Sequence, residues 1–186
     1  MIGKKLVKIV AVAAALVVCA DAADAQRSHA RNTNLRDGFW FSGGLGYGSL
    51  GCDDCTSREG SVSGDLSVGG TLSQRWLVGV GSSAWSKTTD QGARLTVATL
   101  DARVRFYPST TGGFFLTGGI GAGSLRGDFG GLSATETGVG TILGLGWDIR
   151  VASNASVTPY WNGFAMRKNE NVNANVGQAG IAITLH

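Results

Sequence analysis

The sequence has little of what marks most soluble enzymes, metal proteins and helical membrane proteins. Two of its 186 residues are proline, two are histidine and three are cysteine, and charged residues make up only 16%. No uninterrupted apolar run reaches the about 20 residues that a transmembrane helix needs. The formal net charge is +3, without the concentrated basic face that nucleic-acid binding requires. Both histidines, His29 and His186, lie near the termini, which leaves few candidates for a general base.

The sequence is instead rich in glycine, and its apolar and polar side chains alternate strictly over long segments. Thirty residues are glycine, and many sit within segments where apolar and polar residues alternate. In residues 95–122, the clearest case, Leu100 lies opposite Asp101, Arg103 and Arg105. A period of two over this length predicts two strands joined by a tight turn, with different environments on their two faces. Because central strands of soluble α/β proteins are apolar on both faces, the pattern favours a membrane barrel that is apolar outside and polar inside.

Residues 1–25 have the pattern of a secretory signal peptide. A basic segment with three lysines precedes the apolar residues 9–18, and the small residues 23–25 form a cleavage site. A membrane anchor, or a lipoprotein signal ending at Cys19, is the alternative. Residues 26–37 follow as a short N-terminal tail, whose basic residues we expect to be solvated.

Residues 38–186 are predicted to form one domain with eight strands. Short turns at 73–75, 108–113 and 152–155 alternate with longer loops, which is the pattern of an outer-membrane barrel. Closure is required, because an open sheet edge in lipid would leave backbone groups without hydrogen bonds. The fold class is therefore all-β, an eight-stranded antiparallel up-and-down transmembrane β-barrel. The predicted strands are residues 39–49, 62–72, 76–86, the two strands of 95–122, then 136–150, 156–166 and 176–185.

The whole of residues 38–186 resembles the small eight-stranded outer-membrane β-barrel family, the OmpA/OmpX type. The segments that carry the resemblance are the Gly- and aromatic-rich opening at 38–48, Arg-Phe-Tyr-Pro at 105–108, Gly-Gly-Ile-Gly at 118–121, Thr-Pro-Tyr at 158–160 and the alternating last strand. The resemblance implies insertion into the bacterial outer membrane by the barrel-insertion machinery. Outer-membrane lipid and lipopolysaccharide would then surround the protein, and a surface partner would bind through the outer loops.

Seven charged residues are predicted to point into the barrel. An eight-stranded barrel is only wide enough for its interior side chains to fill it, and buried charges must be paired. We therefore expect a lumen ion-pair network that plugs the barrel, with an ion or proton path as the alternative. The predicted members are Asp65, Asp101, Arg103, Arg105, Glu136, Asp148 and Arg150.

Two short motifs lie in the predicted outer loops. Cys52 and Cys55 form a Cys-x-x-Cys without a second cysteine pair or a histidine nearby, which favours a disulfide in an oxidising compartment over a metal site. The tripeptide at residues 126–128, Arg-Gly-Asp, spells an integrin-binding sequence, but three residues recur often by chance. We expect no cofactor and no metal.

The expected function is a structural or surface-interaction role in the outer membrane, without catalysis. The alternatives are a lipid A-modifying enzyme, a narrow pore and a soluble lipocalin-like barrel that binds a ligand. A serine nucleophile would need a general base, and an even-stranded barrel keeps both termini, and so both histidines, on the periplasmic side.

Overall fold

The computed structural model describes residues 36–52, 57–89, 92–169 and 172–186. The predicted signal peptide at residues 1–25 lies outside these ranges, as does most of the predicted tail. The described residues contain no helix that is long and apolar enough to cross a membrane.

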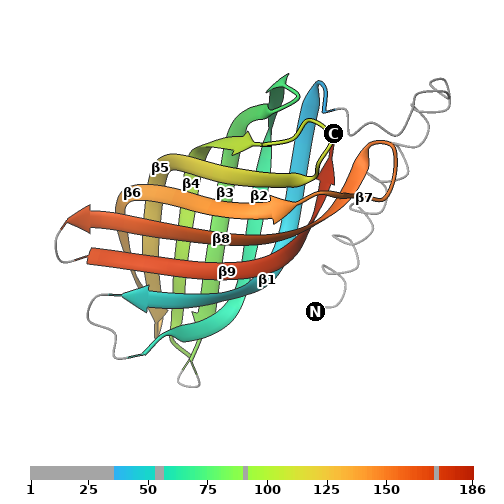
Figure 1. The fold of residues 1–186 in the computed structure, drawn as a ribbon. Helices are drawn as coiled ribbons and strands as arrows, with labels where there is room; N and C mark the ends of the chain where they lie inside the picture. The colour runs from blue at the N-terminus through green and yellow to red at the C-terminus, as the bar shows by residue number, and fades with distance from the viewer. Residues whose placement is uncertain (1–35, 53–56, 90–91, 170–171) are drawn as a thin grey trace. The chain divides into compact units, whose positions relative to one another are not determined.

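The described residues form a closed antiparallel barrel. Strand neighbours follow chain order, β1 pairs with β9, and β6 pairs with β8, so the sheet returns on itself (Figure 1). Asp148 interrupts the predicted sixth strand, so that β6 and β7 together are one strand of eight. The predicted eight-stranded fold is confirmed. Its segments are β1 (Phe39–Cys52), β2 (Glu59–Ser73), β3 (Trp76–Thr88), β4 (Arg94–Phe106), β5 (Phe114–Phe129), β6 (Leu132–Trp147), β7 (Ile149–Arg150), β8 (Ala155–Asn169) and β9 (Val172–Leu185).

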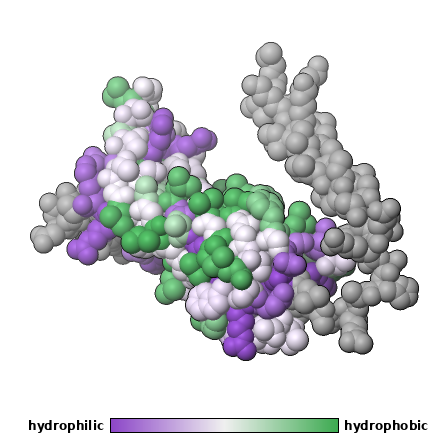
Figure 2. All heavy atoms as spheres, turned by 90° about the horizontal axis from the view of Figure 1, so that it is seen from above, coloured by the Kyte–Doolittle hydropathy of each residue, from purple (hydrophilic) through white to green (hydrophobic). Residues whose placement is uncertain are grey.

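Side chains alternate between the two faces of the barrel wall, as the sequence predicts. Leu45, Leu100 and Leu143 point outward and expose 73%, 63% and 70% of their surface, whereas Asp101 and Arg103 are buried inside. On the face shown in Figure 2, hydrophobic side chains gather mostly over the middle of the wall, and hydrophilic ones lie toward the ends. This arrangement suits a wall that is surrounded by hydrocarbon.

The strands run further than the sequence predicts, and two predicted loops are largely strand. The first lies between the predicted strands that end at 122 and begin at 136, where the Gly-rich residues 125–134 suggest a loop. There β5 and β6 continue and meet at Gly130 and Gly131. These glycines have φ angles of +58° and +84°, which a two-residue hairpin turn requires and other residues rarely adopt. The second of these loops lies between the predicted strands 156–166 and 176–185, where β8 extends to Asn169 and β9 begins at Val172. Apart from the two-residue β7, the strands have 13 to 16 residues where about 10 cross a bilayer, so they extend beyond the apolar band.

The barrel interior has three layers rather than one polar lumen. We call the end that carries Arg36 and His186 the inner end, and the opposite end the outer end. An aromatic layer of Trp40, Leu77, Tyr107 and Phe115 lies at the inner end, and polar residues fill the middle. The third, outer layer is apolar, so the prediction of a uniformly polar interior is wrong. Large apolar side chains are needed there to fill the space between the charges and the outer end. This outer layer consists of Leu50, Trp85, Val97, Ile142, Phe164, Ala174 and Val176.

A charge on the outer wall should destabilise the barrel according to its depth. Leu100 lies at the middle of β4 and Leu72 near the inner end of β2, and both are exposed on the outer face. We expect Leu100→Arg to lower the free energy of unfolding by about 2–4 kcal/mol, and Leu72→Arg to lower it by about 0–1 kcal/mol. Urea unfolding in lipid vesicles measures both values. Equal costs at the two positions would contradict the membrane placement.

Candidate functional site: the filled lumen

A buried ion cluster occupies the centre of the lumen. Arg103 of β4 donates from Nη1 to Asp65 Oδ2 of β2 at 2.8 Å and from Nε to Asp101 Oδ1 at 2.8 Å. Ser83 of β3 donates to Asp65 Oδ2 at 2.7 Å. All four side chains are almost completely buried. The sheet register brings these four side chains together, because β2, β3 and β4 are neighbours and direct them to the same interior face.

A glycine makes room for the central arginine. A Cβ atom at Gly81 of β3 would lie 2.2 Å from the Arg103 guanidinium carbon, so any side chain there would displace the guanidinium from its carboxylates. Gly81 pairs with Asp101 across β3 and β4, directly beside the cluster. The lack of a side chain at Gly81 therefore leaves the space that the Arg103 guanidinium occupies beside its carboxylates.

Arg105 lies one layer closer to the inner end and is held mainly by aromatic rings. Its guanidinium carbon lies 4.5 Å from the Trp40 ring centroid and 4.8 Å from that of Phe115, within the range of cation–π interactions. Its Nη2 donates to Ser67 Oγ at 3.0 Å. Arg105 thus links the polar centre to the aromatic layer without a direct carboxylate partner.

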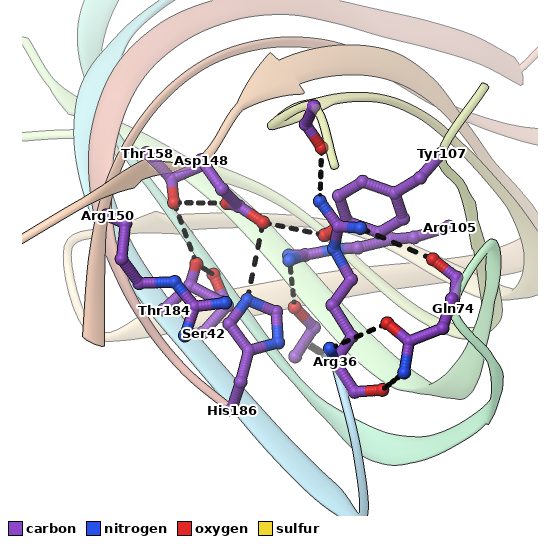
Figure 3. A network of polar contacts seen from close by, with 12 residues as sticks. Arg36, Ser42, Gln74, Arg105, Tyr107, Asp148, Arg150, Thr158, Thr184 and His186 are labelled. Atoms are coloured by element: carbon purple, nitrogen blue, oxygen red, sulfur yellow. Dashed lines mark hydrogen bonds and ion pairs between the residues drawn. The ribbon is translucent and has the colours of Figure 1, made fainter. Parts of the chain in front are cut away.

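Asp148 organises a second polar group near the inner end (Figure 3). Its Oδ2 accepts a hydrogen bond from Tyr107 at 2.7 Å and lies 3.3 Å from His186 Nε2, and its Oδ1 accepts one from Thr158 at 2.7 Å. The Asp148 backbone N–H donates to Gly113 instead of continuing the strand ladder. The break between β6 and β7 therefore coincides with the residue that turns inward to collect these donors.

Arg36 fills the inner end and corrects the expectation of a solvated tail. Its side chain is 1% exposed, and its guanidinium carbon lies 3.5 Å from the centroid of the Tyr107 ring. It donates to the backbone carbonyls of Gln74, Thr110 and Gly112, all in inner turns. The Gln74 side chain in turn holds the Arg36 backbone through two hydrogen bonds of 3.0 and 2.8 Å. Arg36 closes the inner end of the lumen, because its side chain connects two turns across that end.

Two of the seven charges predicted for the lumen network lie apart from it. Glu136 pairs with Lys168 at the outer end, where both side chains are close to half exposed. Arg150 donates to the Ser153 carbonyl at 2.6 Å in an inner turn. Both positions follow the inward alternation, but neither joins the central ion cluster. Water solvates the charge of Glu136, whereas Arg150 is partly buried near Asp148 at the inner end (Figure 3).

The two short loop motifs have different outcomes. The disulfide predicted between Cys52 and Cys55 lies outside the described residues, since the Cys52 side chain and all of Cys55 are among those left out. The Arg-Gly-Asp tripeptide lies on β5 and not in a loop, and Arg126 Nη2 binds Asp128 Oδ1 at 2.9 Å. The hydrogen bond from Arg126 lowers the pKa of the Asp128 carboxyl below its usual value.

The cavity beside the ion cluster is small. A cavity of about 10 Å³ lies beside the ion cluster and is lined by residues that include Arg103, Arg105 and Tyr160. A single water molecule needs a cavity of about 10–15 Å³. Among the described residues, no group of three or more His, Cys, Asp or Glu side chains could hold a metal ion.

Comparison with known proteins places the chain in a family. Its sequence matches the model of the outer membrane protein β-barrel domain over residues 10–184. The chain belongs to this family. It is therefore an integral protein of the bacterial outer membrane, and the apolar face of the barrel wall lies against lipid. No curated protein matches the sequence significantly.

Solved structures of outer-membrane barrels share the fold. Neisserial surface protein A aligns with a TM-score of 0.58 and 15% identity, over 82% of this chain and 99% of that one. The attachment invasion locus protein of Yersinia pestis, Ail, aligns with a TM-score of 0.57 and 13% identity, over 81% and 100%. At these identities the likeness concerns the fold.

Breaking the central ion cluster should destabilise this outer-membrane barrel. Arg103→Ala leaves two carboxylates buried without a counter-charge, and we expect it to lower the free energy of unfolding by about 3–5 kcal/mol. The triple variant Arg103→Met, Asp65→Asn, Asp101→Asn removes both signs and should recover most of this loss. The unfolding midpoint in detergent micelles measures the effect.

The exposed pair on β5 is the matched control. Arg126 and Asp128 have the same spacing as Arg103 and Asp101 but lie in water, so Arg126→Ala should leave the midpoint nearly unchanged. A small effect of Arg103→Ala, equal to that of Arg126→Ala, would mean that the central charges are hydrated.

Proposed function

We propose that this chain is a sealed, non-catalytic outer-membrane barrel with a structural and surface-contact role in the cell envelope. The observation that carries the proposal is the filling of the lumen at three levels. Arg36 and Tyr107 close the inner end, the cluster around Arg103 occupies the centre, and Trp85 and Phe164 of the apolar layer close the outer half. A sealed barrel anchors its ends in the envelope and transports nothing through its centre.

The position of the histidines supports a role without catalysis. His186 is buried at the inner end against Asp148, and His29, the second histidine of the sequence, precedes the barrel. An enzyme that modifies lipid A must act at the outer leaflet, on the opposite side of the apolar layer. A serine nucleophile at the outer end would therefore lack a histidine base.

The outer end offers a surface for contacts. The tip of the β5–β6 hairpin exposes Phe129 and Leu132, and β6 pairs with β8 only from Val139 onward. Among the described residues, no strand pairs with the other edge of β6 between 132 and 138. Exposed strand edges bind extended segments of other proteins. Ail, which shares the fold, is named for attachment and invasion, and this supports a surface role here. Lipopolysaccharide beside the outer end and the barrel-insertion machinery are further proposed partners.

Ion conductance tests whether the barrel is sealed. In planar lipid bilayers we expect no single-channel conductance for the wild-type barrel, because every layer of the lumen is occupied. All three levels must be opened together, by Arg36→Gly at the inner end, Trp85→Ala and Phe164→Ala at the outer end, and removal of both signs of the central cluster. With Arg103→Ala, Asp65→Ala and Asp101→Ala added for that cluster, the variant should produce measurable channels. Phe129→Ala, at the exposed hairpin tip, is the control and should stay silent.

Stable wild-type channels, with an ion selectivity that changes in Arg103→Gln, would contradict the proposal and identify a narrow pore. Covalently altered lipid A in cells that express the wild-type protein, detected by mass spectrometry, would contradict the absence of catalysis.

A further inference from the structure

A groove of about 790 Å³ crosses the outer face of the barrel wall from β3 to β6. Its long axis begins at Trp76 and Phe106 near the inner end and reaches Ile120 and Leu143 toward the middle of the wall. Apolar side chains form its rims. It is distinct from the filled lumen, which lies on the other side of the same strands.

The groove exists because two small residues form its floor. Gly118 of β5 lies between Val104 of β4 and Leu143 of β6, so these two rim side chains stand about two strand spacings, or about 10 Å, apart. Ala102 is the other small residue. A Cβ atom at Gly118 would have no neighbour closer than 3.9 Å, so the space above it is open. A width of this order admits a single hydrocarbon chain.

The surroundings of the groove indicate what fills it. The family places this wall in the outer membrane, and the groove lies in the half nearer the inner end. We assign the inner end to the periplasmic side, because it carries the C-terminal residue His186 and an even number of strands returns both chain ends to one side. Its inner end carries the aromatic pair Trp76 and Phe106, with ring centroids 4.5 Å apart, as expected at the level of lipid headgroups. Arg75, the residue before Trp76, is exposed and forms no ion pair with a described residue.

We propose that this groove binds one acyl chain of a phospholipid from the inner leaflet of the outer membrane. The chain lies over Gly118 and Ala102, and the lipid phosphate pairs with the Arg75 guanidinium at the bilayer surface. Charge complementarity at Arg75 favours an anionic headgroup such as phosphatidylglycerol over a zwitterionic one. This site goes beyond the sealed-barrel function, since a sealed barrel needs no retained lipid.

Native mass spectrometry of the folded barrel, titrated with phosphatidylglycerol or phosphatidylethanolamine, tests this site. The wild-type barrel should retain one phospholipid molecule, with a preference for phosphatidylglycerol. Gly118→Leu fills the groove and should reduce retention about tenfold, the equivalent of about two buried methylene groups. Arg75→Gln should lower retention of both lipids, because both carry the phosphate, but it should lower that of phosphatidylglycerol more and so remove the preference for it.

Gly64→Leu is the matched control. Gly64 also lies on the outer face with open space around it, its nearest neighbour being 3.6 Å from a Cβ, but on β2 outside the groove. It should retain lipid like the wild type, and a heat-shifted gel band confirms that each variant is folded. Equal retention in Gly118→Leu and wild type would overturn the proposal. A wild-type dimer that Gly118→Leu dissociates would also overturn it, by showing that a second copy of the chain fills the groove.

Discussion

This structure depends on one constraint: within lipid, every backbone N–H and C=O group must find a hydrogen-bond partner in the protein itself. Hydrocarbon offers no hydrogen bonds, so the sheet must close, and here it closes where β1 meets β9. Closure with eight strands fixes the width of the barrel, and the width allows a single column of side chains inside. The outer face must then be apolar because it lies against lipid, and the inner face must pack because no space remains for bulk water.

Charge balance governs how the interior packs. Three buried carboxylates, those of Asp65, Asp101 and Asp148, share the lumen with the three arginines Arg36, Arg103 and Arg105. Only Arg103 binds its carboxylates directly, while Arg36 and Arg105 lie against aromatic rings and carbonyl or hydroxyl oxygens. Buried charges of both signs at short range compensate one another's loss of hydration. This explains how so small a barrel contains six charged groups.

The alternation of side chains made the fold predictable, and its period of two also placed Asp65, Asp101 and Arg103 on one interior face. Three features of the structure were not predicted from this alternation. Strand pairing within residues 125–134 depends on a tight turn at two glycines with positive φ. In a sequence with so many glycines, nothing marks these two as the turn. Arg36 lies before the first strand, so no periodicity places it. The apolar outer layer was hidden because Trp85 and Phe164 were read only as members of strands, although their inward parity was available in the sequence.

The central claim is that solvent does not reach the middle of the lumen. Ser83 lies there beside the ion cluster with a side chain that is completely buried. A Ser83→Cys variant, in a chain whose Cys19, Cys52 and Cys55 are replaced by serine, can be treated with a small charged thiol reagent while folded in vesicles. We expect no modification until the barrel is unfolded, whereas Phe129→Cys at the exposed hairpin tip, in the same cysteine-free chain, reacts at once. Rapid modification at position 83 of the folded barrel would contradict a packed, sealed lumen.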